Sequence, residues 1–358
     1  MMKRRLFPLA AAGLIATGAL GDHLYGAVQP TSAAVRTATS SPPLPSALAI
    51  DAATEHANAV AGPSVVYVES AGMGSGSGVI YDSKGDIVTN AHVVRGAQSI
   101  TVTLNDGRTL KASVAGTDIA DDLAVIRVNA SNLTPAHFAS AGSYRVAQTV
   151  LAIGSPVGLK QSVTSGLISG VKRVEQEPNG AYLPDAIQTS APINPGNSGG
   201  ALVMLNGTVA GIPTLVQTAT QDGASAQGLG FAIPAERVVS MVGQIIAQGH
   251  VVHTGRAFLG VALGQGAGQP ALSFGNGSGP TVAGATINTV APGSPAASAG
   301  LQAGDTIIAI DGATVTSDAD LLSALAAQKP GAAAILSVNR QGQTIQATVH
   351  LTELPAAK

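Results

Sequence analysis

The sequence of 358 residues contains no cysteine and no tryptophan. Without cysteine, the chain has no disulfide, no thiolate metal ligand and no cysteine nucleophile. Aromatic residues make up only 3% of the chain, so we expect its cores to be built from Val, Ile, Leu and Ala. Any catalysis must therefore use hydroxyl, imidazole and carboxylate groups.

Charged residues are also scarce: they make up 11% of the chain and leave a net charge of −2. This balance gives no electrostatic footprint for nucleic acid, so we expect no nucleic-acid partner. We also predict no metal site and no cofactor. The hydrophobic share of 45% is ample for packed cores, and the length is that of about two domains.

The N-terminal residues 1–21 are typical of an export signal. Lys3, Arg4 and Arg5 precede an apolar run over 6–20, and a basic segment before a short apolar stretch is the pattern of a signal peptide. The alternative is a retained signal anchor, although the run is short for a membrane span. Either form predicts an exported protein, periplasmic or in the cell envelope. Residues 22–50, rich in Pro, Ser, Thr and Ala, read as a flexible linker.

Residues 51–250 have the pattern of an all-β domain. Short apolar runs rich in Val and Ile alternate with turn signals, such as Asn105-Asp106-Gly107 and Asn206-Gly207. Many short strands of this kind indicate a barrel or a sandwich. A helix is predicted to close the domain, with Pro234 in its first turn and Gly249 as its C-terminal stop.

Residues 256–353 form a second, α+β unit. We expect strands over 258–263, 285–290, 305–310, 334–339 and 344–351, a short helix near 296–299, and a helix over 318–328 with Ser317 as its N-cap. Residues 264–280 between the first two strands are rich in glycine.

Three local patterns in the first domain could carry chemistry. Ser198 lies within Gly196-Asn197-Ser198-Gly199-Gly200, where glycines allow an exposed hydroxyl and converging backbone N–H groups. His92 lies in an apolar segment, and Asp121 and Asp122 open an apolar strand. Taken alone, these patterns also fit a glycine-rich hairpin, a core histidine and a solvated turn.

Together the three patterns indicate hydroxyl catalysis, which needs a base for the serine proton and an acid that orients the imidazole. The order His92, Asp122, Ser198 is the order used by trypsin-fold proteases. Asp121 remains a competing acid. If His92 is a neutral base, activity should fall as the pH drops through the pKa of an ordinary imidazole, about 6.5.

The sequence resembles the HtrA (Do-like) family of exported serine proteases with one C-terminal PDZ domain. The matching stretches are 76–80, 89–94, 122–126, 153–158, 162–166, 188–200 and 228–234, and for the PDZ unit 258–261, 300–301 and 304–312. The resemblance implies a trypsin-like double β-barrel over 51–250, followed by a smaller α+β PDZ domain over 256–353. It also suggests a homotrimer.

The resemblance implies roles for individual residues. Ser198 would be the nucleophile, His92 the general base and Asp122 the acid that orients it. The backbone N–H groups of Gly196 and Ser198, with Asn197 between them, would form the oxyanion hole.

Specificity and peptide binding are assigned in the same way. Pro192 would lie at the base of the primary pocket, with Leu229 and Phe231 on its wall, which predicts cleavage after small or medium aliphatic residues. The alternative is that Leu229 and Phe231 fill core. The PDZ domain would bind C-terminal peptides as an added strand, through Phe258, Leu259, Gly260, Val261, Leu321, Leu322 and Leu325. Arg256 would assist the peptide carboxylate or be merely exposed.

Two functional hypotheses follow. The first is an exported endopeptidase that hydrolyses unfolded or damaged proteins. The second is a catalytically weak protease fold that works as a chaperone or a peptide-binding sensor. The complete set of Ser198, His92 and Asp122 favours the first hypothesis.

Overall fold

The computed structural model describes residues 47–155, 161–176, 182–194, 196–214, 228–264 and 282–356. The predicted export signal and nearly all of the predicted linker lie outside these ranges, as do residues 265–280 of the glycine-rich insert. Within the ranges, no helix is both long and apolar enough to cross a membrane.

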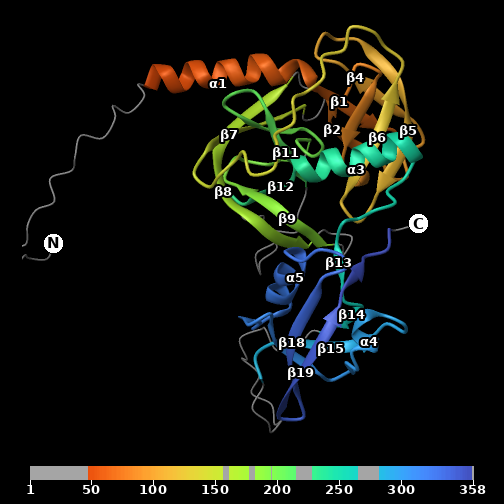
Figure 1. Cartoon of the computed structure of the whole chain (residues 1–358). Helices are drawn as coiled ribbons and strands as arrows, with labels where there is room; N and C mark the ends of the chain where they lie inside the picture. The colour runs from red at the N-terminus through yellow and green to blue at the C-terminus, as the bar shows by residue number, and fades with distance from the viewer. Residues whose placement is uncertain are drawn as a thin grey trace, which may run out of the picture. The chain divides into compact units, whose positions relative to one another are not determined.

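The first six strands form a closed barrel in the order β1-β2-β3-β6-β5-β4, with every neighbouring pair antiparallel (Figure 1). The strands are β1 Val65–Ser70, β2 Gly74–Ile80, β3 Asp86–Thr89, β4 Ile100–Thr103, β5 Thr109–Asp118 and β6 Leu123–Val128. The turn at Asn105-Asp106-Gly107 joins β4 to β5 as predicted, and the Gly107 N–H donates to Leu104 O at 2.9 Å. Branched aliphatic side chains, among them Val66, Val102 and Ile126, fill this barrel.

The next six strands close a second antiparallel barrel in the order β10-β11-β12-β9-β8-β7. They are β7 Thr149–Gly154, β8 Ser162–Gln176, β9 Tyr182–Thr189, β10 Ala201–Met204, β11 Val209–Thr214 and β12 Gly230–Pro234. The predicted turn at Asn206-Gly207 joins β10 to β11, and the Gly207 N–H donates to Met204 O at 2.8 Å. The all-β double-barrel prediction is therefore confirmed.

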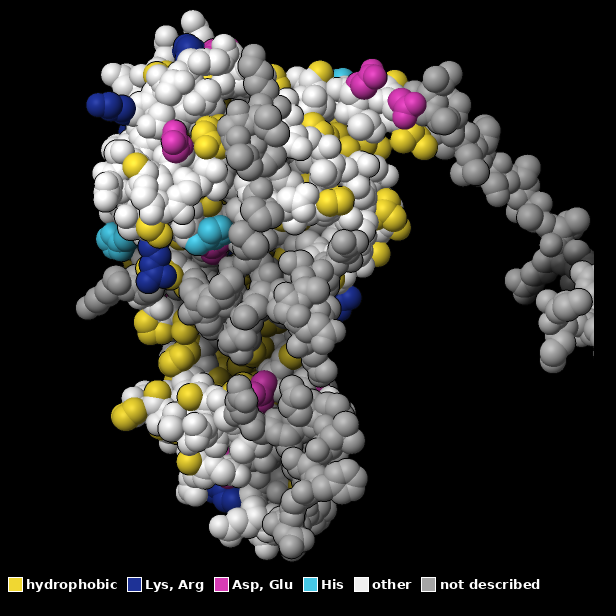
Figure 2. All heavy atoms as spheres, turned by 180° about the vertical axis from the view of Figure 1, so that it is seen from behind, with side chains coloured by type: hydrophobic (Ala, Val, Ile, Leu, Met, Phe, Trp, Pro, Cys, Tyr) yellow, Lys and Arg dark blue, Asp and Glu magenta, His cyan; other side chains and the backbone are white. Residues whose placement is uncertain are grey.

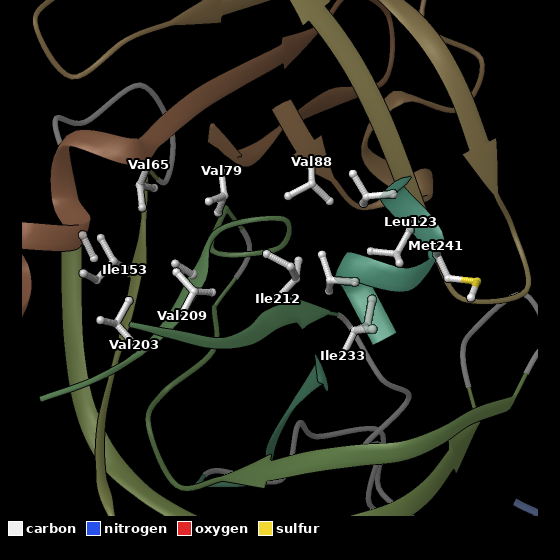
Figure 3. Close-up of a cluster of buried hydrophobic side chains, with 14 of the residues drawn as sticks. Val65, Val79, Val88, Leu123, Ile153, Val203, Val209, Ile212, Ile233 and Met241 are labelled. Carbon is white, nitrogen blue, oxygen red and sulfur yellow. The ribbon is translucent and has the colours of Figure 1, made fainter. Parts of the chain in front are cut away.

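A shared apolar core lies between the two barrels (Figure 3). Val65, Val79, Val88 and Leu123 enter it from the first barrel, and Ile153, Val203, Val209, Ile212 and Ile233 enter it from the second. Each such side chain contributes about 1.5–3 kcal/mol when fully buried. This core fixes the position of one barrel against the other, so strand ends from both barrels can form a single site.

Helix α3, Ala235–Gln248, covers this core and contacts strands of both barrels (Figure 1). It begins after Pro234 and ends at Gly249, which has the left-handed φ of 79° that glycine tolerates. Val238, Met241, Val242 and Ile245 form its buried face, at the spacing of one helical stripe. Both predicted helix ends are therefore confirmed.

The sequence did not predict helix α1, Ala47–Ala61, whose first four residues were assigned to the linker. The helix buries only the small side chains Ala57 and Ala61, and it contacts β7 and β10. Its larger side chains Ile50 and Val60 are exposed, so the helix has no periodic stripe of large apolar residues. A short 3₁₀ turn, Gly62–Ser64, joins α1 to β1.

The C-terminal part of the chain is an α+β unit with its own core. Its main sheet has the order β14-β15-β16-β18-β19, β17 pairs with β16, and β13 pairs with β20. The elements are β13 Ala257–Phe258, β14 Val261–Leu263, β15 Ala285–Val290, α4 Pro295–Ser298, β16 Thr306–Ile310, β17 Ala313–Thr314, α5 Asp318–Ala326, β18 Ala333–Arg340, β19 Gln343–His350 and β20 Thr352–Glu353. Ser317 caps α5 as predicted and accepts from the Asp320 N–H at 3.2 Å.

One strand prediction in this unit is wrong. The apolar run 258–263 was expected to be a single strand, but the chain breaks between β13 and β14 at Gly260, where φ is +84°. A Cβ on that glycine would lie 2.2 Å from the Ser294 side chain. The two halves of the run therefore pair with different strands, β20 and β15.

The described surface carries few charged groups on the face shown in Figure 2. This matches the 11% of charged residues in the sequence. Most of the buried charges of the first domain lie instead in two small clusters beside the barrel interface, which are described next.

Candidate functional site

His92 and Asp122 form a close pair at the edge of the first barrel. His92 lies on the short helix α2, Ala91–Val94, directly after β3. Asp122 precedes β6 in a turn with a φ of 50°. The ring Nδ1 lies 2.8 Å from Asp122 Oδ2, and the His92 backbone N–H donates to Asp122 Oδ1 at 3.0 Å. Asp122 thus binds both the ring and the backbone of His92, while 38% of the His92 side chain remains exposed.

Three further groups hold the buried Asp122. Thr214 Oγ1, at the end of β11, donates to Asp122 Oδ2 at 2.7 Å. Asn90 Nδ2 and the Ala91 N–H both donate to the Asp122 carbonyl oxygen, at 3.0 and 3.1 Å. Thr214 belongs to the second barrel, so both barrels hold this carboxylate. Sequence reasoning missed Thr214, because no local pattern distinguishes a threonine at the end of an apolar strand.

Asp121, the competing acid, is bound elsewhere. Its carboxylate accepts from Arg237 of α3 at 3.0 and 2.6 Å, and it forms an ion pair with Arg256. Burial alone would raise the pKa of Asp121, but the two guanidinium groups outweigh it and hold this pKa below its usual value. The structure therefore pairs Asp122, not Asp121, with His92.

The ion pair also corrects the prediction for Arg256. Its guanidinium is largely buried, and besides Asp121 it donates to the carbonyl oxygen of Ala120. It is therefore not merely exposed. Arg256 also lines the cavity of the C-terminal unit, so its role beside a peptide carboxylate stays a prediction. Asp118 lies beside the same cluster, and burial together with the negative charge of Asp121 raises its pKa to about 7.

The serine loop, residues 196–200, has the backbone that its glycines allow. Gly196 and Gly199 have φ values of +102° and +81°, in the region that favours glycine. A Cβ on Gly199 would lie 2.4 Å from Thr89 Oγ1 and 3.2 Å from Asn90 N. The loop therefore packs directly against the segment that carries His92.

Gly76 of β2 also shows that the serine loop lies beside the segment that carries His92. A Cβ on Gly76 would lie 2.8 Å from the Val93 side chain and 3.1 Å from the Ser198 carbonyl oxygen. The residue after His92 and the backbone of Ser198 thus flank one glycine. Segments around residues 92, 122 and 198, which are distant in sequence, meet where the two barrels join.

Ser198 is only 2% exposed, and its Oγ has no hydrogen-bond partner among the residues that the structure describes. The Ser198–His92 hydrogen bond is therefore not made in this conformation. The backbone N–H groups of Gly196 and Ser198 also donate no hydrogen bond to any residue that the structure describes. Asn197 is buried, and its Nδ2 lies 3.4 Å from the Pro192 carbonyl oxygen.

The residues predicted for the primary pocket are divided between surface and core. Pro192 is exposed, and its carbonyl oxygen accepts from Thr164 Oγ1 at 2.9 Å. Leu229 is 36% exposed, whereas Phe231 is 3% exposed and belongs to the core between the barrels. For Phe231, this placement matches the alternative in which the ring fills core.

The residues predicted for peptide binding in the C-terminal unit share one cavity of about 360 Å³. All seven line it: Phe258, Leu259, Gly260, Val261, Leu321, Leu322 and Leu325. Residues of the first domain, among them Val174, Asp185 and Arg237, line the same cavity. Leu321 is fully buried and packs in the core of the unit, so its side chain also has a structural role. Within the described ranges, no three His, Asp or Glu side chains lie together as a metal site would require.

Comparison with known proteins assigns both parts of the chain to a class. Residues 76–212 match the trypsin-like peptidase domain, and residues 257–351 match the PDZ domain. The chain is therefore a trypsin-like peptidase followed by a PDZ domain.

Relatives define the family. The chain is 36% identical over 309 residues to the serine endoprotease DegS of Escherichia coli K12, an alignment that covers 83% of this chain and 84% of DegS. It is 42% identical over 280 residues to a probable periplasmic DegP-like serine endoprotease of Halomonas elongata, and it spans only 56% of that protein. This chain belongs to the HtrA family of serine endoproteases.

Solved structures agree with this assignment. The HtrA-type protease AlgW in complex with a tripeptide is 36% identical, covers 85% of this chain and 98% of its own, and superposes with a TM-score of 0.62. The serine endoprotease from Yersinia pestis is 32% identical, covers 84% of this chain and 97% of its own, and superposes with a TM-score of 0.57.

Proposed function

We propose that this protein is an exported endopeptidase that hydrolyses peptide bonds of unfolded or damaged proteins, with Ser198 as its nucleophile. The observation that carries the proposal is the 2.8 Å contact between His92 Nδ1 and Asp122 Oδ2. A buried carboxylate on Nδ1 fixes the imidazole tautomer and stabilises the imidazolium that forms when the serine is deprotonated. Among the described residues, this is the arrangement best suited to activating a hydroxyl.

In the proposed reaction, Ser198 Oγ attacks the carbonyl carbon of the scissile peptide bond. Because Asp122 occupies Nδ1, the proton of Ser198 passes to Nε2 of His92. The tetrahedral intermediate collapses when His92 returns this proton to the leaving amine, which gives an acyl-enzyme on Ser198. Water, deprotonated by His92, then hydrolyses the ester.

The backbone N–H groups of Gly196 and Ser198 would stabilise the negative charge on the substrate oxygen. Neither N–H group donates a hydrogen bond within the described residues. Both can therefore donate to a substrate oxygen without breaking an existing bond. Each such donor contributes about 3–4 kcal/mol when aimed at the developing oxyanion. The attack also requires Ser198 Oγ to rotate toward His92, since it makes no hydrogen bond in this conformation.

Specificity is proposed to come from the surface near Pro192 and Leu229. Neither residue offers a carboxylate that would pair with Lys or Arg in a substrate. We therefore expect cleavage after small or medium aliphatic residues. Phe231 would support this wall from the core rather than touch the substrate.

The PDZ domain is proposed to bind the C-terminal ends of protein chains. Its cavity is lined partly by apolar side chains of β14 and α5, among them Val261, Leu322 and Leu325, and partly by residues of the first domain. An extended peptide that adds a strand beside β14 would place alternate side chains in this groove. AlgW has been solved with a tripeptide and with a decapeptide, so peptide binding is known for a relative.

Location and assembly complete the proposal. Relatives from Halomonas elongata and Haemophilus influenzae are named as periplasmic proteases, and residues 1–21 have the pattern of an export signal. We propose a periplasmic or cell-envelope location, with the signal either removed or retained as an anchor, and a homotrimer by family resemblance. Native mass spectrometry of the purified protein measures the mass of the assembly directly.

One observation favours the second hypothesis, a chaperone or peptide sensor of low activity. Ser198 is buried, and its Oγ is not bonded to His92. A protein that stayed in this conformation could bind unfolded chains without cleaving them.

The two functions are distinguished by incubating the full chain with a denatured protein and sequencing the new termini. The endopeptidase proposal predicts new termini after aliphatic residues, none of them with Ser198→Ala, and little cleavage of the same protein when folded. If wild type and Ser198→Ala suppress aggregation equally and neither produces new termini, the endopeptidase proposal is wrong and the second hypothesis holds.

A further inference from the structure

Ser77 is a fully buried polar residue whose side chain joins three segments at the barrel junction. It lies on β2, and its Oγ donates to the Gly196 carbonyl oxygen at 2.5 Å. The same Oγ accepts from the Ser155 N–H, just after β7, at 2.8 Å. A single hydroxyl therefore connects a strand of the first barrel to the serine loop and to a strand end of the second barrel.

The peptide unit that Ser77 holds lies between the two proposed oxyanion donors. The Gly196–Asn197 peptide is fixed at its oxygen by Ser77 and at its nitrogen by the bond from the Asn197 N–H to Asn194 O, at 2.9 Å. The N–H of Gly196 precedes this peptide, and the N–H of Ser198 follows it. The two dihedral angles that bound this peptide, ψ of Gly196 and φ of Asn197, set the direction of one donor relative to the other.

The local backbone needs such a restraint. Gly196 has a φ of +102°, and a glycine has a broad range of alternative conformations that other residues do not have. The oxyanion hole must be held close to its productive geometry to be effective. The Ser77 hydroxyl is the side-chain bond that holds the carbonyl of this glycine.

The backbone of Ser77 makes separate contacts that do not depend on its side chain. Its N–H donates to the Ser198 carbonyl oxygen at 2.8 Å, and its carbonyl oxygen accepts from Thr89 Oγ1 at 2.6 Å. Replacement of the side chain should leave these bonds in place. The contribution of the hydroxyl can therefore be measured separately from the contribution of the strand.

We propose that Ser77 is a positioning residue for the oxyanion hole, acting through the Gly196–Asn197 peptide. The inference depends on the proposed peptidase function, because the hole has a role only in acyl transfer. Ser77 would touch neither the substrate nor His92. Its loss should therefore weaken binding of the tetrahedral intermediate and leave binding of the substrate unchanged.

The test compares Ser77→Ala with Ser70→Ala in the full chain. Ser70 is a matched control, since it is a buried serine at the end of the neighbouring strand β1 whose Oγ has no partner within the described residues. For Ser77→Ala we expect kcat on a peptide substrate to fall about 10- to 100-fold with KM nearly unchanged, a smaller effect than losing a donor outright. Ser70→Ala should retain both constants.

A pair of inhibitors separates positioning from general damage. A peptide aldehyde forms a hemiacetal with Ser198, and its oxygen occupies the oxyanion hole, whereas the corresponding peptide alcohol forms no covalent bond. In Ser77→Ala the Ki of the aldehyde should rise by about the same factor as kcat falls, because both report binding of the tetrahedral species. The Ki of the alcohol and the pH at half-maximal activity should match wild type.

The outcomes distinguish this inference from the proposed function. If wild type neither hydrolyses peptides nor binds the aldehyde more tightly than the alcohol, the peptidase proposal fails. If wild type is active and Ser77→Ala keeps its kcat and aldehyde Ki, only the role of Ser77 is wrong.

If Ser77→Ala is unfolded, the same measurements are made with Ser77→Cys, which is close in volume and a weaker donor. A folded Ser77→Cys with reduced kcat and a raised aldehyde Ki supports the inference, and one with wild-type constants overturns it. If both variants are unfolded, the hydroxyl holds the fold rather than the oxyanion hole, which also overturns the inference.

Discussion

Asp121 and Asp122 are consecutive in the chain, yet their carboxylates bind different partners. Asp122 Oδ2 lies 2.8 Å from His92 Nδ1, whereas Asp121 Oδ2 lies 2.6 Å from Arg237 Nη2 and the other oxygen pairs with Arg256. The positive φ of Asp122, 50°, accompanies the change in direction between the two side chains. One turn therefore supplies both the proposed acid and a carboxylate that forms ion pairs with Arg237 of helix α3 and with Arg256 at the start of the second unit.

Substitution of the two carboxylates should affect different properties, activity for Asp122 and stability for Asp121. Asp122→Asn should lower kcat about 10⁴-fold, because the amide no longer stabilises the required imidazole tautomer. Asp121→Asn should leave kcat within about tenfold and lower the free energy of unfolding by about 3–5 kcal/mol, because buried guanidinium groups lose their partner. Peptidase kinetics and denaturant unfolding of both variants measure this. An inactive but stable Asp121→Asn would contradict the assignment.

Thr214 should affect catalysis through Asp122. Its Oγ1 donates to Asp122 Oδ2 at 2.7 Å, so Thr214→Val leaves the buried carboxylate with one donor fewer. We expect kcat to fall roughly 10-fold, since a bond to a charged group contributes about 1.5–3 kcal/mol. Thr214→Ser keeps the hydroxyl and should restore most of the activity. Equal activities for the valine and serine variants would show that this bond has no catalytic role.

Asp118 should make stability depend on pH. Burial and the negative charge of Asp121 raise its pKa to about 7, from 3.8. The folded state therefore binds this proton more tightly than the unfolded state does. The stabilisation is complete below about pH 4 and is lost as the pH rises through 7.

The matching variant is Asp118→Asn, which cannot titrate. Its stability relative to wild type should increase between pH 4 and pH 8 by on the order of 4 kcal/mol, about 1.4 kcal/mol for each unit of the shift. Urea unfolding at pH 4.5, 6 and 8 measures this difference. A constant difference across the range would mean that Asp118 is ionised throughout.

The serine loop should tolerate no side chain at Gly199. A Cβ there would lie 2.2 Å from the Ser77 carbonyl oxygen, and φ is +81°. Gly199→Ala should therefore cost more than about 2 kcal/mol of stability, and kcat/KM should fall with it.

Gly243→Ala is the control for this substitution, because Gly243 is exposed on α3 and a Cβ there would have no other atom within 4 Å. It should raise stability by about 0.5–1 kcal/mol, which is the helix preference for alanine over glycine. Thermal unfolding of both variants measures the difference. Similar thermal midpoints for the two would contradict this interpretation of the loop.

The sequence predicted the features that depend on local chemistry. Turns with Asn and Gly and the ends of α3 at Pro234 and Gly249 follow from short motifs, whereas the choice of Asp122 over Asp121 as the partner of His92 came from the family resemblance. The many short strands predicted a barrel or a sandwich, and the family resemblance narrowed this to a double barrel.

The features that it did not predict depend on contacts between distant segments. Arg256 pairs with Asp121 across 135 residues, and no local pattern selects that partner from the other carboxylates. Thr214 reaches Asp122 only because the two barrels share a core. Helix α1 was missed because its buried side chains are alanines. Phe231 was assigned to the substrate pocket because the residues around it resemble the family. Its burial depends on the core that the two barrels share, to which it belongs.

Activation of Ser198 by His92 is tested most directly by labelling the folded full chain with a fluorophosphonate, followed by intact mass and peptide mapping. This reagent reacts with a serine only when a base and an oxyanion hole activate it. We predict one adduct, on Ser198, that forms more slowly as the pH falls and His92 becomes protonated, and that is absent from Ser198→Ala. No adduct on folded wild type at pH 8, or an adduct that persists in Ser198→Ala, would contradict this prediction.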